Sequence, residues 1–143
     1  MDVTRGRRDS RWPVSVKGVV WLGDRVVLAH NSRGQWELPG GRLRRNESLE
    51  QGLAREIREE TSLDATVGPL LGAYVFDAIL HKRVVVLAYG CAAGADQQPR
   101  PSAEHTEVSL FRPDTLAALV VPDRYRDAIE HWSADDAARL LSR

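Results

Sequence analysis

Several features that mark special classes of protein are missing from this sequence. Its 143 residues include a single cysteine, Cys91, which excludes an internal disulfide and favours a reducing compartment such as the cytoplasm. No apolar run is long enough to span a membrane, and no apolar secretory core follows the basic N-terminus. Because Cys91 falls in an apolar, strand-like run, we interpret it as a core residue and not as a nucleophile.

An excess of charge of either sign is also missing. The 20 basic and 20 acidic residues give a formal net charge of zero, so the whole molecule has no electrostatic bias toward nucleic acid or membrane. The hydrophobic content of 43% and charged content of 28% are typical of a soluble globular protein. We therefore expect one domain over residues 1–143, with residues 1–12 as a flexible N-terminal arm.

What the chain does contain is a concentration of acids and arginines at residues 55–60, downstream of a Pro39-Gly40-Gly41 turn. A helix turns about 100° per residue, so Glu56, Glu59 and Glu60 would share one helix face. Three like charges held together raise one another's proton affinity. A hard divalent cation would compensate for them, and the Gly40 carbonyl could offer it a further oxygen ligand. Such an oxygen-only site suits magnesium or manganese.

The residues around these acids predict the helix that carries them. Ser48 and Gln51 have the form of a capping box, so a helix is expected to begin near Ser48. Leu49, Leu53 and Ile57 recur every four residues and draw an apolar stripe along it. Because this stripe lies beside the carboxylate face, the acids are expected at the edge of the core.

The segment from Gly41 to Leu63 resembles the Nudix box, G-x5-E-x7-R-E-U-x-E-E-x-G-U, in which U is a bulky aliphatic residue. Gly41 is followed by five residues and Glu47, and seven more lead to the run that starts at Arg55. Eight of the nine specified positions match, the exception being Ser62 in place of glycine. We expect Ser62 to adopt the left-handed conformation at a cost of roughly 1 kcal/mol, with no metal ligand lost.

The resemblance implies an α/β fold, specifically a Nudix-like α/β/α sandwich with a mixed β-sheet between helices. Strands are expected at residues 14–21, 25–30, 66–77, 83–92 and 107–111, and the box helix at 48–61. A loop is expected at 93–102. Short helices are expected from Asp114 to Leu119, from Pro122 through Trp132 and, capped by its hydroxyl, from Ser133. Tyr125, Ile129 and Trp132 are expected to bury one face of the C-terminal helix.

The activity that the resemblance implies is divalent-metal-dependent hydrolysis of a nucleoside diphosphate linked to another moiety. The substrate would be a small nucleotide and the cofactor Mg²⁺, with Mn²⁺ as the alternative. By their positions in the box, Glu59 and Glu60 are predicted metal ligands together with Gly40, and Glu56 either is a ligand or orients the attacking water.

Arg55 is predicted to pair with Glu47 and to hold the catalytic loop against the helix. Without its neighbouring segments, the helix could also be a solvent-exposed helix with no catalytic role, stabilised by i,i+4 pairs such as Arg55–Glu59. The glycine turn and the spacing to Glu47 favour the catalytic interpretation over that alternative.

The general base is less well defined by the sequence. In many Nudix proteins a glutamate from a later loop completes the site, and Glu104 and Glu107 are the candidates here. A solvated loop acid is an equally weighted interpretation of both. Trp36 is expected to pack under the loop, with stacking on a base as the alternative.

Two other functions compete with the enzyme. One is a non-catalytic nucleotide-binding or regulatory module on the same fold, which the complete set of box acids disfavours. The other is hydrolysis of capped or triphosphorylated RNA, which the absence of a basic stripe disfavours. Neither the specific nucleotide nor the oligomeric state follows from the sequence, and a homodimer, common in the family, stays open.

Overall fold

The computed structural model describes residues 11–77, 82–103 and 107–143 of the chain. The elements in these ranges are β1 (Val14–Leu22), β2 (Arg25–His30), β3 (Trp36–Glu37), β4 (Gly40–Arg42), α1 (Leu49–Thr61), β5 (Ala65–Asp77), β6 (Arg83–Ala93), β7 (Glu107–Phe111), the 3-10 helix η2 (Pro113–Ala118), α2 (Asp123–Glu130) and α3 (Ala134–Leu141). No helix among them is long and apolar enough to cross a bilayer.

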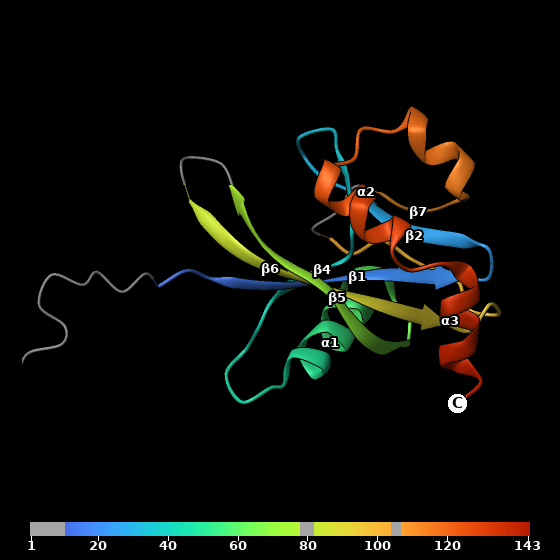
Figure 1. The fold of residues 1–143 in the computed structure, drawn as a ribbon, viewed down its shortest axis with the longest axis horizontal. Helices are drawn as coiled ribbons and strands as arrows, with labels where there is room; N and C mark the ends of the chain where they lie inside the picture. The colour runs from blue at the N-terminus through green and yellow to red at the C-terminus, as the bar shows by residue number, and fades with distance from the viewer. Residues whose placement is uncertain (1–10, 78–81, 104–106) are drawn as a thin grey trace, which may run out of the picture.

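One mixed sheet forms the centre of the molecule (Figure 1). Its main path runs β3-β2-β1-β6-β5, with β4 also pairing β1 and β7 also pairing β2. Strands β1 and β6 are parallel over nine residue pairs, and the other pairings are antiparallel. The tight turn between β1 and β2 uses Gly23 at φ +65°, as expected for a short hairpin.

Helices cover both faces of this sheet, as Figure 1 shows. Alternate residues of β1 point to opposite faces. Val16 and Val20 pack with Leu53 and Ile57 of α1, whereas Val19 belongs to the apolar cluster formed with α2 and α3. The predicted α/β/α sandwich is therefore confirmed: among the described helices, α1 covers one face of the sheet and α2 and α3 cover the other.

The expected elements agree closely with those observed, with three differences. Strands β3 and β4 were not predicted, because their two and three residues are held by pairing with β2 and β1 and carry no periodicity of their own. The helix expected from Asp114 is a 3-10 turn that begins at Pro113, without a side-chain cap. The helix after Pro122 ends at Glu130, before Trp132.

The predicted buried residues near the C-terminus are confirmed. Tyr125, Ile129 and Trp132 are all buried. The Trp132 indole donates to the Cys91 carbonyl at 3.0 Å, and the Trp21 indole donates to the Trp132 carbonyl at 2.7 Å. These two hydrogen bonds fasten the segment between α2 and α3 to the sheet. Cys91 is itself fully buried, and burial raises the pKa of its thiol to about 12, which fits its interpretation as a core residue.

Candidate active site

The Pro39-Gly40-Gly41 turn is pressed against strand β1. Gly40 has φ +146°, and a Cβ atom there would lie 1.9 Å from the carbonyl oxygen of Val16. Only glycine fits this combination of backbone angle and close approach. In this turn the Gly40 amide donates a hydrogen bond of 3.1 Å to Oε2 of Glu60, twenty residues later in the chain. The turn and the last part of α1 are thus joined directly.

The three acids that share a face of α1 differ in their exposure. Glu60 is buried, with 6% of its surface exposed. The side chain of Glu56 is 16% exposed and that of Glu59 is 46% exposed. The carboxylates therefore run from the core edge toward solvent, and the most buried of them is the one bonded to the glycine turn. A buried carboxylate is costly unless it is hydrogen-bonded or paired.

Arg55 is the cation that holds the rest of the acid set. Its guanidinium contacts both carboxylate oxygens of Glu47, at 2.6 and 2.9 Å, in the fork geometry predicted from the sequence. It also donates to Glu56 at 3.0 Å, to Glu59 at 3.1 Å and to the Arg42 carbonyl at 3.1 Å. Arg55 thus makes both the i,i+4 pair with Glu59 and the pair with Glu47 that the sequence suggests, and the two pairs belong to one network.

This network changes the acidity of its members. The hydrogen bonds from Arg55 and from the Arg44 amide lower the pKa of Glu47 from an ordinary value of 4.5 to about 2. The pKa of Arg55 is raised, chiefly by its hydrogen bond to Glu47. Glu47 is therefore a fixed anion at neutral pH, and its pairing ties the loop between β4 and α1 to the helix.

The same contacts determine how the site could hold a metal. No three His, Cys, Asp or Glu side chains are grouped to hold an ion in the part of the chain that the structure describes. Glu56 and Glu59 point to Arg55, and Glu60 accepts from Gly40. The donor set still fits a hard cation chemically, because it consists of carboxylate and carbonyl oxygens beside a buried acid. Their role as ligands stays a prediction.

A cavity of 460 Å³ opens over these acids. Its lining combines box residues with a distant part of the chain: Arg42, Leu43, Arg44, Arg55, Glu56, Glu59, Glu60, Ser102 and Ala103. The loop expected at 93–102 therefore reaches the acid helix. Glu104, one of the two candidate bases, lies outside the described residues. Glu107, the other, is exposed at the start of β7, where its carboxylate accepts from the Ser109 hydroxyl at 3.1 Å and does not line this cavity.

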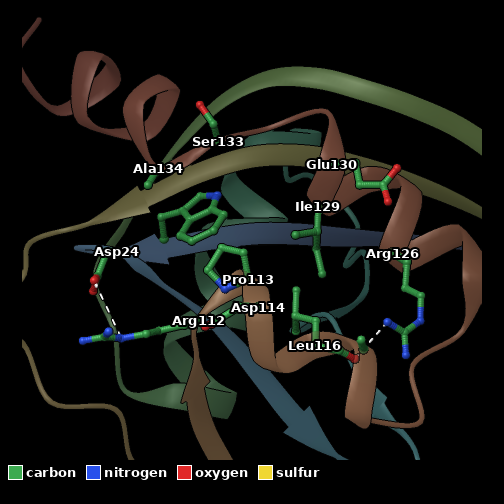
Figure 2. A pocket seen from close by; sticks show the side chains of 12 residues that line it. Asp24, Arg112, Pro113, Asp114, Leu116, Arg126, Ile129, Glu130, Ser133 and Ala134 are labelled. Atoms are coloured by element: carbon green, nitrogen blue, oxygen red, sulfur yellow. Dashed lines mark hydrogen bonds and ion pairs between the residues drawn. The ribbon is translucent and has the colours of Figure 1, made fainter.

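A larger cavity of 680 Å³ lies elsewhere, between η2, α2, the start of α3 and the β1–β2 turn (Figure 2). Its walls are mainly apolar and include Leu116 and Ile129. Asp24 and Arg112 at its rim are 3.9 Å apart and face each other in Figure 2. None of the box residues lines it. Size alone would favour this cavity as the active site. The chemistry of the lining side chains favours the smaller cavity, which lies next to the acids.

Two features of the site region were not predicted from the sequence. The Arg44 guanidinium is 3.2 Å from the Glu59 carboxylate. The Lys17 ammonium is 3.4 Å from the Gly40 carbonyl oxygen. The available signal for Lys17 was a charged side chain inside an otherwise uncharged strand at residues 14–21. Trp36 does pack, against His30 and Phe111 with ring centroids 4.8 Å apart in each case.

Comparisons with known proteins agree with this geometry. The NUDIX domain family model matches residues 11–132. A MutT-like protein of Streptomyces ambofaciens is 38% identical over 137 residues, which cover 90% of this chain and 86% of that protein. The CTP pyrophosphohydrolase of Escherichia coli is 44% identical over 74 residues, which cover 46% of this chain and 55% of that protein.

Solved structures give the same result. The crystal structure of a MutT NUDIX hydrolase from Burkholderia pseudomallei superimposes with a TM-score of 0.72 at 26% identity, covering 85% of this chain and 98% of that one. Fold, box residues and family model thus coincide over the same stretch of sequence. The chain belongs to the Nudix family of hydrolases.

Proposed function

We propose that this protein is a divalent-metal-dependent pyrophosphohydrolase that cleaves a nucleoside diphosphate linked to another moiety. The observation that carries the proposal is the buried Glu60 bonded to the Gly40 amide, next to acids that Arg55 gathers around one cavity. Such a group of carboxylates repels a polyphosphate unless cations lie between them. A nucleotide substrate is also consistent with the similarity to a CTP pyrophosphohydrolase.

The side chains divide into two kinds of role. Glu59 and Glu60, with the Gly40 carbonyl, would hold Mg²⁺ or Mn²⁺, and Glu56 would be a ligand or orient the attacking water. When bound, the cation would neutralise phosphate oxygens and make water more acidic. Arg55 and Glu47 would act indirectly, as positioning residues, because their bidentate pair fixes the loop between β4 and α1 against the helix. Arg55 would also have to share Glu56 and Glu59 with the metal.

The non-catalytic binding module is the second candidate, and one measurement separates it from the enzyme. The purified protein is incubated with Mg²⁺ and a panel of nucleoside triphosphates, nucleotide sugars and dinucleotides, and phosphate and nucleotide release are measured. We expect release that requires the metal. Binding of nucleotides without any metal-dependent release would contradict the enzymatic proposal.

A pair of glutamate variants in one helix makes this test specific. Glu60→Gln removes the buried charge and should lower activity by on the order of 10–100-fold or more. Glu50→Gln is the matched control, because Glu50 lies exposed in the first turn of the same helix and does not line the cavity. Glu50→Gln should retain wild-type activity. Equal activity of both variants would contradict a role for Glu60.

We propose Glu104 ahead of Glu107 as the general base. Ser102 and Ala103 line the cavity over the acids, and Glu104 is the next residue in the sequence. Glu104→Gln should lower kcat by roughly 10²–10⁴-fold with little change in KM, whereas Glu107→Gln should leave kcat near the wild-type value. If both variants keep full turnover, this loop has no catalytic role.

A further inference from the structure

Lys17 stands next to the glycine turn but belongs to a different strand. It lies in β1 directly opposite Gly40 of β4, and its ammonium nitrogen is 3.4 Å from the Gly40 carbonyl oxygen. The amide of the same glycine donates to the buried Glu60. Gly40 therefore contacts Lys17 through its carbonyl and the most buried acid of the box, Glu60, through its amide.

Lys17 lines a third cavity, of 350 Å³, whose lining does not include the box acids. This cavity lies against the sheet, between β1, β3, the paired ends of β5 and β6, and the start of α2. Part of its wall is the stacked pair Phe76 and Tyr125, whose ring centroids are 5.7 Å apart. Lys17 thus lies at the boundary between this cavity and the turn that contacts the acid helix.

Both acids that line this cavity have partners other than Lys17, and the second cation of its lining, Arg33, is exposed to solvent. Glu37 accepts from the Asn31 amide at 3.2 Å, and Asp77 pairs with Arg83 at 3.3 Å. In the described ranges Lys17 has no ion pair, and its contact with the Gly40 carbonyl is at the long end of hydrogen-bond distances. A half-buried ammonium held only by a carbonyl is available to an incoming anion.

We propose that Lys17 is a substrate-binding residue whose ammonium contacts a phosphate oxygen of the nucleotide, at the border between the 350 Å³ cavity and the catalytic acids. This inference rests on the proposed function. Lys17 places a positive charge beside the glycine turn that contacts the most buried acid of the box. Lysine binds phosphate as a point charge, so it would neutralise the substrate from the side away from helix α1.

The sequence supplies a matched control, because it contains only two lysines, Lys17 and Lys82. Lys82 is exposed and lines none of the cavities described above. Lys17→Met keeps the aliphatic stem and removes the charge. It should raise KM for the best substrate of the panel about tenfold or more, with kcat changed less than about threefold. Lys17→Arg should recover most of the lost affinity, and Lys82→Met should behave as wild type.

Binding can be followed without turnover. Protein labelled with ¹³C at the lysine Cε gives two lysine signals, assigned by the loss of one in Lys17→Arg. We expect methylenediphosphonate, a pyrophosphate mimic with a CH₂ group in place of the bridging oxygen, to shift the Lys17 signal saturably with Mg²⁺ present. The Lys82 signal should not move.

The two proposals fail in different ways. A wild-type protein that hydrolyses nothing in the panel contradicts the proposed function, whereas the lysine signals still report phosphate binding. An active wild type in which Lys17→Met leaves KM unchanged and the mimic leaves the Lys17 signal in place would overturn the role of Lys17. A Tm equal to that of the wild type would show that the Lys17→Met variant is folded.

Discussion

At the scale of single residues, the box departs from the family pattern at one position, and the structure shows what that departure does. Ser62 ends helix α1 with φ 63° and ψ 15°, and its amide donates to the Arg58 carbonyl. This is the left-handed C-terminal conformation expected for the family glycine at this position. The backbone therefore follows the path expected for glycine, and the Cβ atom of Ser62 makes this conformation less favourable than it would be for glycine.

Replacing this serine tests that cost. Ser62→Gly should stabilise the protein by up to about 1 kcal/mol, because relief of the left-handed strain outweighs the extra flexibility of glycine in the unfolded chain. Urea unfolding measures the change. Ser142→Gly is the control, since Ser142 ends α3 with φ −87° and gains nothing from glycine. A stability gain as large for Ser142→Gly as for Ser62→Gly would contradict the argument.

At the scale of elements, a charged hydrogen-bond network ties the loop between β4 and α1 to the helix. The Glu47 carboxylate accepts from the Arg55 guanidinium and from the Arg44 amide. Its pKa of about 2 lies below the ordinary 4.5 of an unfolded chain. Between pH 4.5 and about pH 2, the folded state thus binds fewer protons at Glu47 than the unfolded state does. The contribution of Glu47 to the free energy of unfolding is therefore lost as the pH falls through this range.

The Glu47→Gln variant measures that contribution. Above pH 5 the wild type should melt at a higher temperature than Glu47→Gln. The difference in Tm should shrink steadily as the pH is lowered toward 2, because Glu47 of the wild type becomes protonated and its pairing is lost. Thermal melts at several pH values between 7 and 2 provide the comparison. A Tm difference that stays constant down to pH 2 would show that Glu47 does not titrate as described.

The elements also show where sequence reasoning succeeds and where it ends. The long strands, the box helix and the Arg55–Glu47 pair follow from patterns within about fifteen residues, and those patterns are local. The contact of Lys17 with Gly40 depends on the register of β1 against β4, 23 residues apart in sequence. Two cavities on either side of one turn result from packing of whole elements, so no local pattern could indicate them.

At the scale of the whole molecule, two apolar clusters share one sheet. One cluster includes α1 and contains Leu53 and Ile57, and the other includes α2 and α3 and contains Trp21 and Trp132. Alternate residues of β1 belong to each. Because one set of strands serves both faces, neither cluster can be lost without the other, and we expect the described elements to unfold as one cooperative unit.

The placement of tryptophan allows this to be tested. Three of the four tryptophans, Trp21, Trp36 and Trp132, belong to or pack against the cluster on the α2 side, and the fourth, Trp12, is exposed, so the change in fluorescence on unfolding reports mainly that face. Far-UV circular dichroism reports the helices of both faces, including α1, which with 13 residues is the longest helix described. The two signals should change together in urea. Leu53→Ala creates a cavity on the α1 side, where no tryptophan packs, and should lower the free energy of unfolding by about 2–5 kcal/mol.

The shift in midpoint for Leu53→Ala should appear equally in fluorescence and in circular dichroism, although the cavity faces away from every buried tryptophan. Ile129→Ala, on the opposite face, is the matched variant and should also move both signals together. If Leu53→Ala lowered only the circular dichroism midpoint, helix α1 would unfold separately from the sheet. The box acids would then sit on an element of independent stability, and their geometry could not be held by the sheet that carries the glycine turn.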